Sequence, residues 1–148
     1  MKKPKENTKI LKSRTPKKKV LSLKKLTIKL DRVFSEYIRR KDVDFQGCTL
    51  CVSCGSRKPW KEQQCGHYNK RSARATRWSE KNCYVQCVVC NIFKKGNYPA
   101  FTEFILNTYG EAFLKVLIQE GKTIKKFSTI DLQNEIEKYT KLISELST

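Results

Sequence analysis

Apolar side chains recur every three or four positions in two long stretches of the chain, one near each end. In the first stretch, residues 21–44, no glycine or proline interrupts the repeat. This spacing is that of one face of an α-helix, so it predicts an amphipathic helix over 21–44. The apolar positions are Leu23, Leu26, Leu30, Val33, Phe34, Tyr37 and Ile38.

The second stretch, residues 98–148, predicts further helices. Pro99 suits the first turn of a helix that Gly110 closes, and a shorter helix follows. Ser128 and Asp131 have the spacing of a capping box, which predicts the start of the last helix. Its narrow apolar seam packs either on the helix over 21–44 or on a second copy of the chain, which leaves a homodimer open. The seam residues are Leu132, Ile136, Tyr139, Ile143 and Leu146.

The helical pattern is missing from two other segments. Residues 1–20 are basic and carry few apolar side chains, so we expect a disordered arm. Residues 45–97 hold all seven cysteines and little aliphatic mass, as in a small unit organised by a metal. The predicted protein is therefore mainly α-helical, with a metal-stapled core between the helix over 21–44 and the helical region over 98–148.

The cysteine usage indicates a reducing compartment. The chain has no apolar N-terminal segment and no apolar run near the length of a membrane span, which argues against secretion and a membrane protein. Its cysteine count is odd, which disfavours a closed disulfide framework. We expect a cytoplasmic protein with reduced thiols.

Two C-x-x-C pairs predict a structural zinc site. Cys51 with Cys54, and Cys87 with Cys90, supply four thiolates at the spacing that tetrahedral zinc prefers. Four sulfurs leave no open coordination position, so this ion is expected to be structural and catalysis must lie elsewhere.

The remaining cysteines leave one alternative open. Cys48 lies three residues before Cys51 and permits a second register for the first pair. Gly55 favours the register that ends at Cys54, because a tight turn follows the second sulfur of such a pair. Cys48, Cys65 and Cys83 are then expected to be small buried residues near the site.

The positive charge points to a polyanionic partner. The net charge is +18, with +11 in residues 1–30 and +8 in residues 57–96, whereas the rest is nearly neutral. This distribution suits a protein that binds DNA both through residues 57–96 and through the basic arm. The alternative for the arm is a non-specific effect of charge.

His67, the single histidine, lies between the two cysteine pairs. Its imidazole can accept a proton from water near neutral pH, as a general base in phosphodiester hydrolysis must. Asn82 and Asn91 follow and offer amide oxygens to a hard cation such as Mg²⁺ or Mn²⁺. The alternative is that His67 is one more polar residue of a zinc module that only binds DNA.

Five motifs follow one another between about residues 49 and 110. They are Cys51-Val-Ser-Cys54-Gly, Gly66-His-Tyr, Arg77-Trp-Ser-Glu-Lys-Asn82, Gln86-Cys-Val-Val-Cys-Asn91 and Lys95-Gly-Asn97. Together they resemble the lambdoid phage NinG/Rap recombination proteins and, more broadly, the ββα-metal (HNH, His-Me finger) nucleases.

The resemblance implies an α+β fold with a ββα finger. In it, a strand bearing His67 and a short strand near Tyr84 precede a helix that starts around Cys87 and ends at Gly96. It also implies that His67 is the general base, Asn82 braces the loop and Asn91 binds the catalytic metal. The phage resolvase endonuclease VII is similar in placing an asparagine directly after the last zinc cysteine.

One position departs from the family pattern. Many such nucleases have an acid or histidine just before the base, where it binds the catalytic metal, and this chain has Gly66. Gln64, Asn69 or Glu80 is expected to supply an oxygen, or waters complete the shell. Cys65 is too soft a ligand to be favoured by magnesium.

Basic side chains around the presumed site are predicted to clamp phosphates, with a solvated charged loop as the alternative. Trp60, Tyr68 and Trp78 either stack on unpaired bases or pack beneath the finger. The predicted DNA contacts are Lys70, Arg71, Arg74, Arg77, Lys81, Lys94 and Lys95.

The sequence thus predicts a divalent-metal-dependent DNA endonuclease, and the resemblance implies that it is of the phage recombination type, acting on branched DNA such as Holliday junctions and D-loops. Two alternatives stay open. One is a non-catalytic zinc-dependent module that binds nucleic acid, and the other is a site-specific HNH nicking or restriction enzyme.

Overall fold

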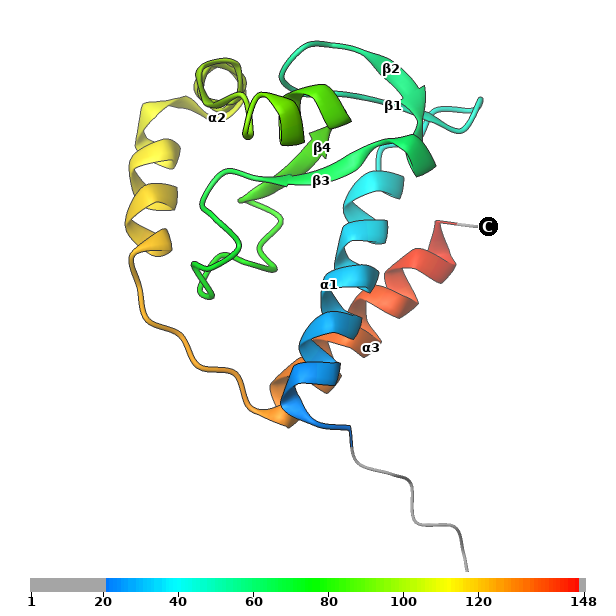
Figure 1. Ribbon diagram of the computed structural model, residues 1–148, viewed down its shortest axis with the longest axis vertical. Coiled ribbons are helices and arrows are strands. Elements are labelled where there is room, and N and C mark those ends of the chain that lie inside the picture. The colour runs from blue at the N-terminus through cyan, green and yellow to red at the C-terminus, as the bar shows by residue number, and fades with distance from the viewer. Residues whose placement is uncertain (1–20, 147–148) are drawn as a thin grey trace, which may run out of the picture.

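The computed structural model describes residues 21–146 (Figure 1), so the arm predicted over 1–20 lies outside the described residues. The α+β class is confirmed: the described residues form helices and two small antiparallel sheets. The elements are α1 (Leu23–Arg40), β1 (Cys48–Leu50), β2 (Arg57–Pro59), η1 (Trp60–Glu62), β3 (Gln64–His67), β4 (Cys83–Gln86), η2 (Val89–Phe93), α2 (Tyr98–Gly121) and α3 (Thr129–Glu145).

Helix α1 is shorter than the predicted 21–44. It begins after Ser22, whose side chain accepts a hydrogen bond from the Lys25 N–H, and it ends at Arg40. The chain then turns, because the Asp44 carboxylate accepts hydrogen bonds from the Gln46 and Cys48 N–H groups. The buried face of α1 consists of Leu26, Leu30, Phe34 and Ile38.

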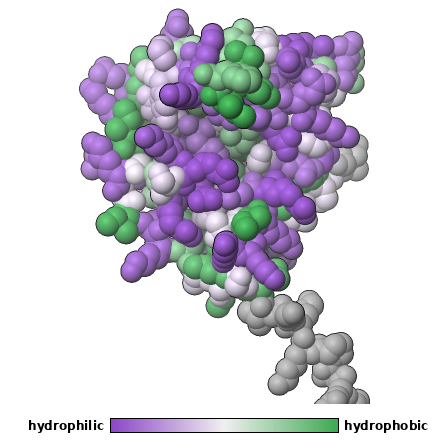
Figure 2. All heavy atoms as spheres, viewed as in Figure 1, coloured by the Kyte–Doolittle hydropathy of each residue, from purple (hydrophilic) through white to green (hydrophobic). Residues whose placement is uncertain are grey.

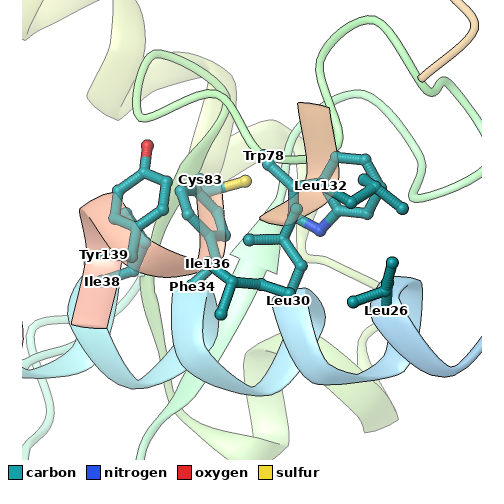
Figure 3. Packing of buried hydrophobic residues seen from close by; sticks show 9 residues of the cluster. All are labelled: Leu26, Leu30, Phe34, Ile38, Trp78, Cys83, Leu132, Ile136 and Tyr139. Carbon is teal, nitrogen blue, oxygen red and sulfur yellow. The ribbon is translucent and has the colours of Figure 1, made fainter. Parts of the chain in front are cut away.

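Helix α3 packs along α1, so three residues of the predicted apolar seam, Leu132, Ile136 and Tyr139, are buried within the chain, whereas Leu146 is exposed. Figure 3 shows Leu132, Ile136 and Tyr139 against the apolar face of α1. The rings of Phe34 and Tyr139 meet edge to face, with centroids 4.9 Å apart. Ser128 and Asp131 form the predicted capping box at the start of α3.

Helix α2 bends at Gly110, as the sequence predicts. Gly110 has φ 83° and ψ 172°, which only glycine adopts at little cost, and Figure 1 shows the two halves of α2 running in different directions. Apolar residues from both halves pack on Tyr84 of β4. These residues are Phe101, Ile105, Leu114 and Leu117.

The pair β3–β4 lies between these two helical layers and carries the site. It is antiparallel, with His67 opposite Cys83 and Gly66 opposite Tyr84. Cys65 and Cys83 face the α1–α3 core, whereas Tyr84 faces α2. The strands predicted at His67 and near Tyr84 are both present.

The segment from Cys87 to Gly96, predicted as a short helix, does not form a regular α-helix. Residues Val89–Phe93 make a π-helical turn, η2, and the chain then leaves helical geometry. Lys95, Gly96 and Asn97 all have positive φ, at 49°, 95° and 45°, and three such residues cannot continue a right-handed helix. Among residues 21–146 no helix combines the length and apolarity needed to cross a membrane.

Candidate metal centre and nucleic-acid site

The four predicted zinc cysteines come together. The sulfurs of Cys51, Cys54, Cys87 and Cys90 all lie within 4.8 Å of one another. The Cys54 and Cys87 sulfurs are 3.7 Å apart, close to the edge of about 3.8 Å that a tetrahedron with zinc–sulfur bonds near 2.3 Å requires. This cluster can therefore hold a metal ion such as zinc.

Hydrogen bonds to the sulfurs support this assignment. The Cys90 N–H donates to the Cys87 sulfur at 3.5 Å, and the Asn97 amide donates to the Cys90 sulfur at 3.4 Å. Burial opposes ionisation of Cys87, but the Cys90 N–H and the neighbouring thiols lower its pKa to about 7. Cys48 is not a member of the cluster, so the register that ends at Cys54 is the one the structure adopts.

His67 and Asn91 line one surface cavity of about 660 Å³. Three of the predicted DNA contacts, Lys70, Arg71 and Lys95, line the same cavity. The cavity lies between α1, β3 and the segment that follows the last zinc cysteine. Residues predicted from separate motifs therefore meet at one place.

His67 is half-buried, and its surroundings favour the neutral form of its imidazole. Its Nε2 donates to the Arg77 carbonyl oxygen at 3.0 Å. Burial lowers the pKa of His67 below its ordinary value, and the charge of Arg71 adds to this effect. Hydrogen bonds with the backbones of Arg77 and Cys65 oppose the shift without reversing it. An uncharged imidazole is the form that accepts a proton.

Asn82 lies outside the cavity and braces the loop between the two strands. Its side chain is fully buried, and its Oδ1 accepts a hydrogen bond from the Asn69 N–H at 2.7 Å. Its Nδ2 donates to the carbonyl oxygens of Asn69 and Thr76, both at 3.1 Å. These hydrogen bonds connect the start of the loop at Asn69 to its end at Asn82, which directly precedes Cys83, the residue opposite His67.

Asn91 presents its amide from the middle of η2. Its Nδ2 donates to the Gln64 side-chain oxygen at 2.7 Å. The other candidate oxygen ligands lie elsewhere: Asn69 donates to the Leu117 carbonyl oxygen, and Glu80 accepts from Tyr37. None of the three candidates, Gln64, Asn69 and Glu80, lines the cavity.

Gly66 has no room for a metal-binding side chain. A Cβ atom there would lie only 2.1 Å from the Gln86 Oε1 atom. The Gln86 amide is fixed in turn, because it donates to the Ser53 hydroxyl at 2.6 Å and to the Gly96 carbonyl oxygen at 2.8 Å. The departure from the family pattern at this position is thus explained by Gln86.

Asp31 is a site residue that the sequence analysis missed. It lines the cavity and accepts hydrogen bonds from Arg71, Arg77 and Trp78 at 2.6 to 2.9 Å. Burial alone would raise the pKa of Asp31, but these hydrogen bonds and the two arginine charges hold it below its ordinary value. The partners are at least 40 residues away in the chain, so no local pattern signalled the contact.

The other predicted phosphate contacts divide into two groups. Arg77 is tied to Asp31 with only 18% of its side chain exposed, and Arg74 lies over the Trp78 ring at 5.7 Å. These two therefore contribute to packing. Lys81 and Lys94 are exposed but do not line the cavity.

The aromatic residues near the predicted site mostly pack against other side chains of the protein. Trp78 is buried against the α1–α3 core, and Tyr68 packs on Phe101 and meets the Thr102 hydroxyl at 3.0 Å. Trp60 lies beneath the guanidinium groups of Arg39 and Arg40, which are 5.2 and 5.3 Å from its ring centroid.

An exposed apolar patch lies on η2, directly beside Asn91. Figure 2 shows apolar side chains gathered over this turn on a mostly polar face. Phe93 is the most open of them, with 74% of its surface exposed. We call this the η2 patch, which consists of Val88, Val89, Ile92 and Phe93.

The fold and the site define a class: a small α+β protein whose middle segment is built on a tetracysteine cluster able to hold a metal ion. The whole chain, residues 1–148, matches the family model described as bacteriophage lambda NinG protein. The chain therefore belongs to the NinG family of phage proteins.

Individual relatives agree with this family. Protein ninG of Escherichia phage 933W is 30% identical over 100 residues, which cover 62% of this chain and 47% of that protein. Protein ninG of Salmonella phage P22 is 28% identical over 111 residues, which cover 69% of this chain and 52% of that protein. The match thus spans about half the length of these relatives. No solved structure matches the chain.

Proposed function

We propose that this protein is a metal-dependent endonuclease that cuts branched DNA. The observation that carries the proposal is the shared cavity, which His67 and Asn91 line together with Lys70, Arg71 and Lys95. A general base, an amide oxygen donor and phosphate-binding cations are what phosphodiester hydrolysis needs at one place. The order of the elements, β3, β4 and then the η2 turn, also follows that of a ββα-metal finger.

Different residues of the chain activate the water, bind the phosphates and hold the loop in place. His67, uncharged and fixed by the Arg77 carbonyl oxygen, accepts a proton from the attacking water. Lys70, Arg71 and Lys95 bind the phosphates beside the scissile bond. Asn82 keeps the loop and His67 in place, so it is a positioning residue.

The residues that line this cavity offer few oxygen ligands to a catalytic divalent cation. The Asn91 amide oxygen is a suitable donor, whereas the Asp31 carboxylate is already engaged by two arginines. Magnesium accepts one or two protein ligands when water and substrate oxygens complete its shell, so Asn91 would hold it. When bound, such an ion neutralises charge that develops on the phosphate.

The η2 patch supports a branched substrate. Phe93 is exposed two residues after Asn91 in the chain, and Lys94 and Lys95 follow it directly. An apolar ring next to cations suits an unstacked base at a branch point, because stacking on an aromatic side chain contributes about 1–3 kcal/mol per base. Fully paired linear DNA offers no such base at its interior.

Cleavage assays test the proposal. The full chain is incubated with four-way junction, flap and linear duplex DNA, with magnesium or manganese, and compared with Asn91→Ala. We expect faster cutting of branched DNA than of the duplex, and loss of cutting but not of binding in Asn91→Ala. Absence of cutting on every substrate would reject the nuclease, and equal rates on all three would reject the preference for branches.

A matched pair of variants tests the η2 patch. Phe93→Ala should weaken binding to the junction by about fivefold or more, the lower end of one lost stacking contact. Phe45→Ala is the control, because Phe45 is 96% exposed in the turn before β1 and is not part of the patch. Equal binding by both variants would remove the patch from the substrate site.

The sparse oxygen donors favour one other function, a zinc-dependent module that binds nucleic acid without cutting it. Of the side chains that line the cavity, Asp31 supplies the single carboxylate, and it is engaged. Salt-sensitive binding to branched DNA, with no cleavage under any divalent metal, is the result that this alternative predicts.

A further inference from the structure

Two cysteines that take no part in the zinc cluster lie beside His67. Cys65 and His67 are two residues apart on β3, so they lie on the same face of the sheet, and Cys83 is opposite His67 on β4. The two sulfurs and one imidazole nitrogen all lie within 4.8 Å of one another. Strand pairing therefore gathers two sulfur ligands and one imidazole nitrogen at one point, a set that suits zinc.

The surroundings allow an ion to reach this point. Cys65 and His67 both line the 660 Å³ cavity, whereas Cys83 is fully buried behind them. The Cys83 sulfur and the His67 Nε2 atom both contact the Arg77 carbonyl oxygen, at 3.7 and 3.0 Å. A histidine that binds a metal through one ring nitrogen commonly donates from the other to such a carbonyl.

We infer that Cys65, His67 and Cys83 form a second metal site, which takes a thiophilic divalent cation such as zinc. Two thiolates and a neutral imidazole carry a charge of −2, which balances the ion, and binding releases the two thiol protons to solvent. Sulfur ligands select against magnesium and calcium. The fourth position of the ion opens towards the cavity, where water or a phosphate oxygen can occupy it.

The site has a consequence for activity that rests on the proposed function. A zinc ion bound to His67 occupies the nitrogen lone pair that a general base needs. Zinc and magnesium would therefore have opposite effects, because zinc blocks His67 whereas magnesium supports cleavage. The chain would be active when free zinc is scarce and the thiols are reduced.

Metal binding tests the site without any measurement of cleavage. The reduced full chain is titrated with Co²⁺, and thiolate-to-cobalt absorption and bound metal per chain are measured. We expect two equivalents in the parent protein and one in Cys65→Ser. Cys48→Ser is the matched control and should retain two, because Cys48 belongs to neither cluster.

Two further variants keep the test decisive. Cys83→Ser and His67→Ala should each bind one equivalent, and the equivalent that stays in the tetracysteine cluster reports that the variant has folded. Saturation of the parent at one equivalent would overturn the inference, and so would two equivalents in Cys65→Ser.

Inhibition by zinc tests the consequence separately. With magnesium present, Cys65→Ser should require at least about tenfold more free zinc than the parent for half inhibition, since even changes in outer contacts weaken metal sites by that much. Cys48→Ser should behave as the parent. Equal sensitivity of the parent and Cys65→Ser would overturn the inhibitory role. Failure of the parent to cut DNA at all would reject the proposed function, and the stoichiometry would still decide the metal site.

Discussion

At the scale of single residues, Asn82 shows how a polar side chain can be structural within a functional site. Its amide makes three hydrogen bonds to the loop that ends beside His67, and none of it is exposed. The sequence motif suggested a bracing asparagine, and the geometry is that of a brace. In the proposed nuclease, Asn82 would thus position His67 rather than contact substrate.

Replacement of Asn82 tests this brace. Asn82→Ala leaves the Asn69 N–H and the Asn69 carbonyl oxygen without this partner in a buried place, whereas the Thr76 carbonyl oxygen keeps the Ser79 N–H. It should therefore lower the free energy of unfolding by about 2–3 kcal/mol. Urea denaturation of the zinc-loaded protein measures this. Asn107→Ala, on the surface of α2, is the control and should change stability little. A loss below about 0.5 kcal/mol in Asn82→Ala would show that the brace is unimportant.

Asp31 gives stability a dependence on pH. Its pKa in the folded protein lies below the ordinary 3.8 because of Arg71, Arg77 and Trp78, despite the opposing effect of burial. A carboxyl group with a lowered folded pKa stabilises the fold fully above its unfolded pKa and loses this effect as the pH falls through the folded value.

Asp31→Asn should therefore be less stable than the parent near pH 7, by about 2 kcal/mol, since charged hydrogen bonds contribute about 1.5–3 kcal/mol each. The difference between the two proteins should shrink below pH 3.8. Thermal denaturation across pH measures it, and metal loss in acid cancels because it affects both proteins. A difference that does not change with pH would contradict the assignment.

At the scale of elements, the β3–β4 pair explains why the chain departs from the usual nuclease pattern. Gly66 lies against the Gln86 side chain, which connects β4 to Ser53 and to Gly96. The Gln86 amide thus links the two cysteine-bearing segments around the strand. A side chain at position 66 would break this link, so a metal ligand there is excluded.

A double-mutant cycle tests the contact. Gly66→Ala should destabilise the protein by about 1–3 kcal/mol, as overpacking of a buried site does. Gln86→Ala should also destabilise it, but the double variant should lose less than the sum, because the shortened side chain makes room for the new methyl group. Additivity within about 0.5 kcal/mol in urea denaturation would rule out the contact.

The elements also show what a single sequence can predict. The break at Gly110, the capping box at Ser128 and the four zinc cysteines were all predicted, because each depends on residues close in sequence or on a strict spacing. The contacts of Asp31 with Arg77 and of Gly66 with Gln86 join residues far apart in the chain, and no local pattern encodes them. Cys65 and Cys83 were predicted to be small buried residues, and only the register of the β3–β4 pair shows that they lie next to His67.

At the scale of the whole molecule, the described residues form two cores that meet at the β3–β4 pair. One core joins α1 and α3, and the other joins Tyr84 to α2. The segment that holds the four zinc cysteines has no such core, because its buried cluster consists of Cys51, Cys87 and Cys90. We therefore expect the stability of this segment to depend on a metal bound by the four cysteines.

Removal of the metal tests this dependence. Structural zinc contributes on the order of 10 kcal/mol in small zinc-finger peptides, so a chelator should release β1, β2 and η2 first. Hydrogen exchange should show loss of protection over 48–59 and 86–97, whereas amides in α1 and α3 stay protected. Uniform protection with and without chelator would show that the cluster carries no structural metal.

The central claim is that His67 acts as the general base in the cavity it shares with Asn91. The most direct measurement is single-turnover cleavage of a four-way junction, bound to saturation with magnesium, by the parent and by His67→Ala. The account predicts equal binding and a rate lower by about 100-fold or more in His67→Ala, as expected for loss of a general base. Equal cleavage rates in the two proteins would contradict it.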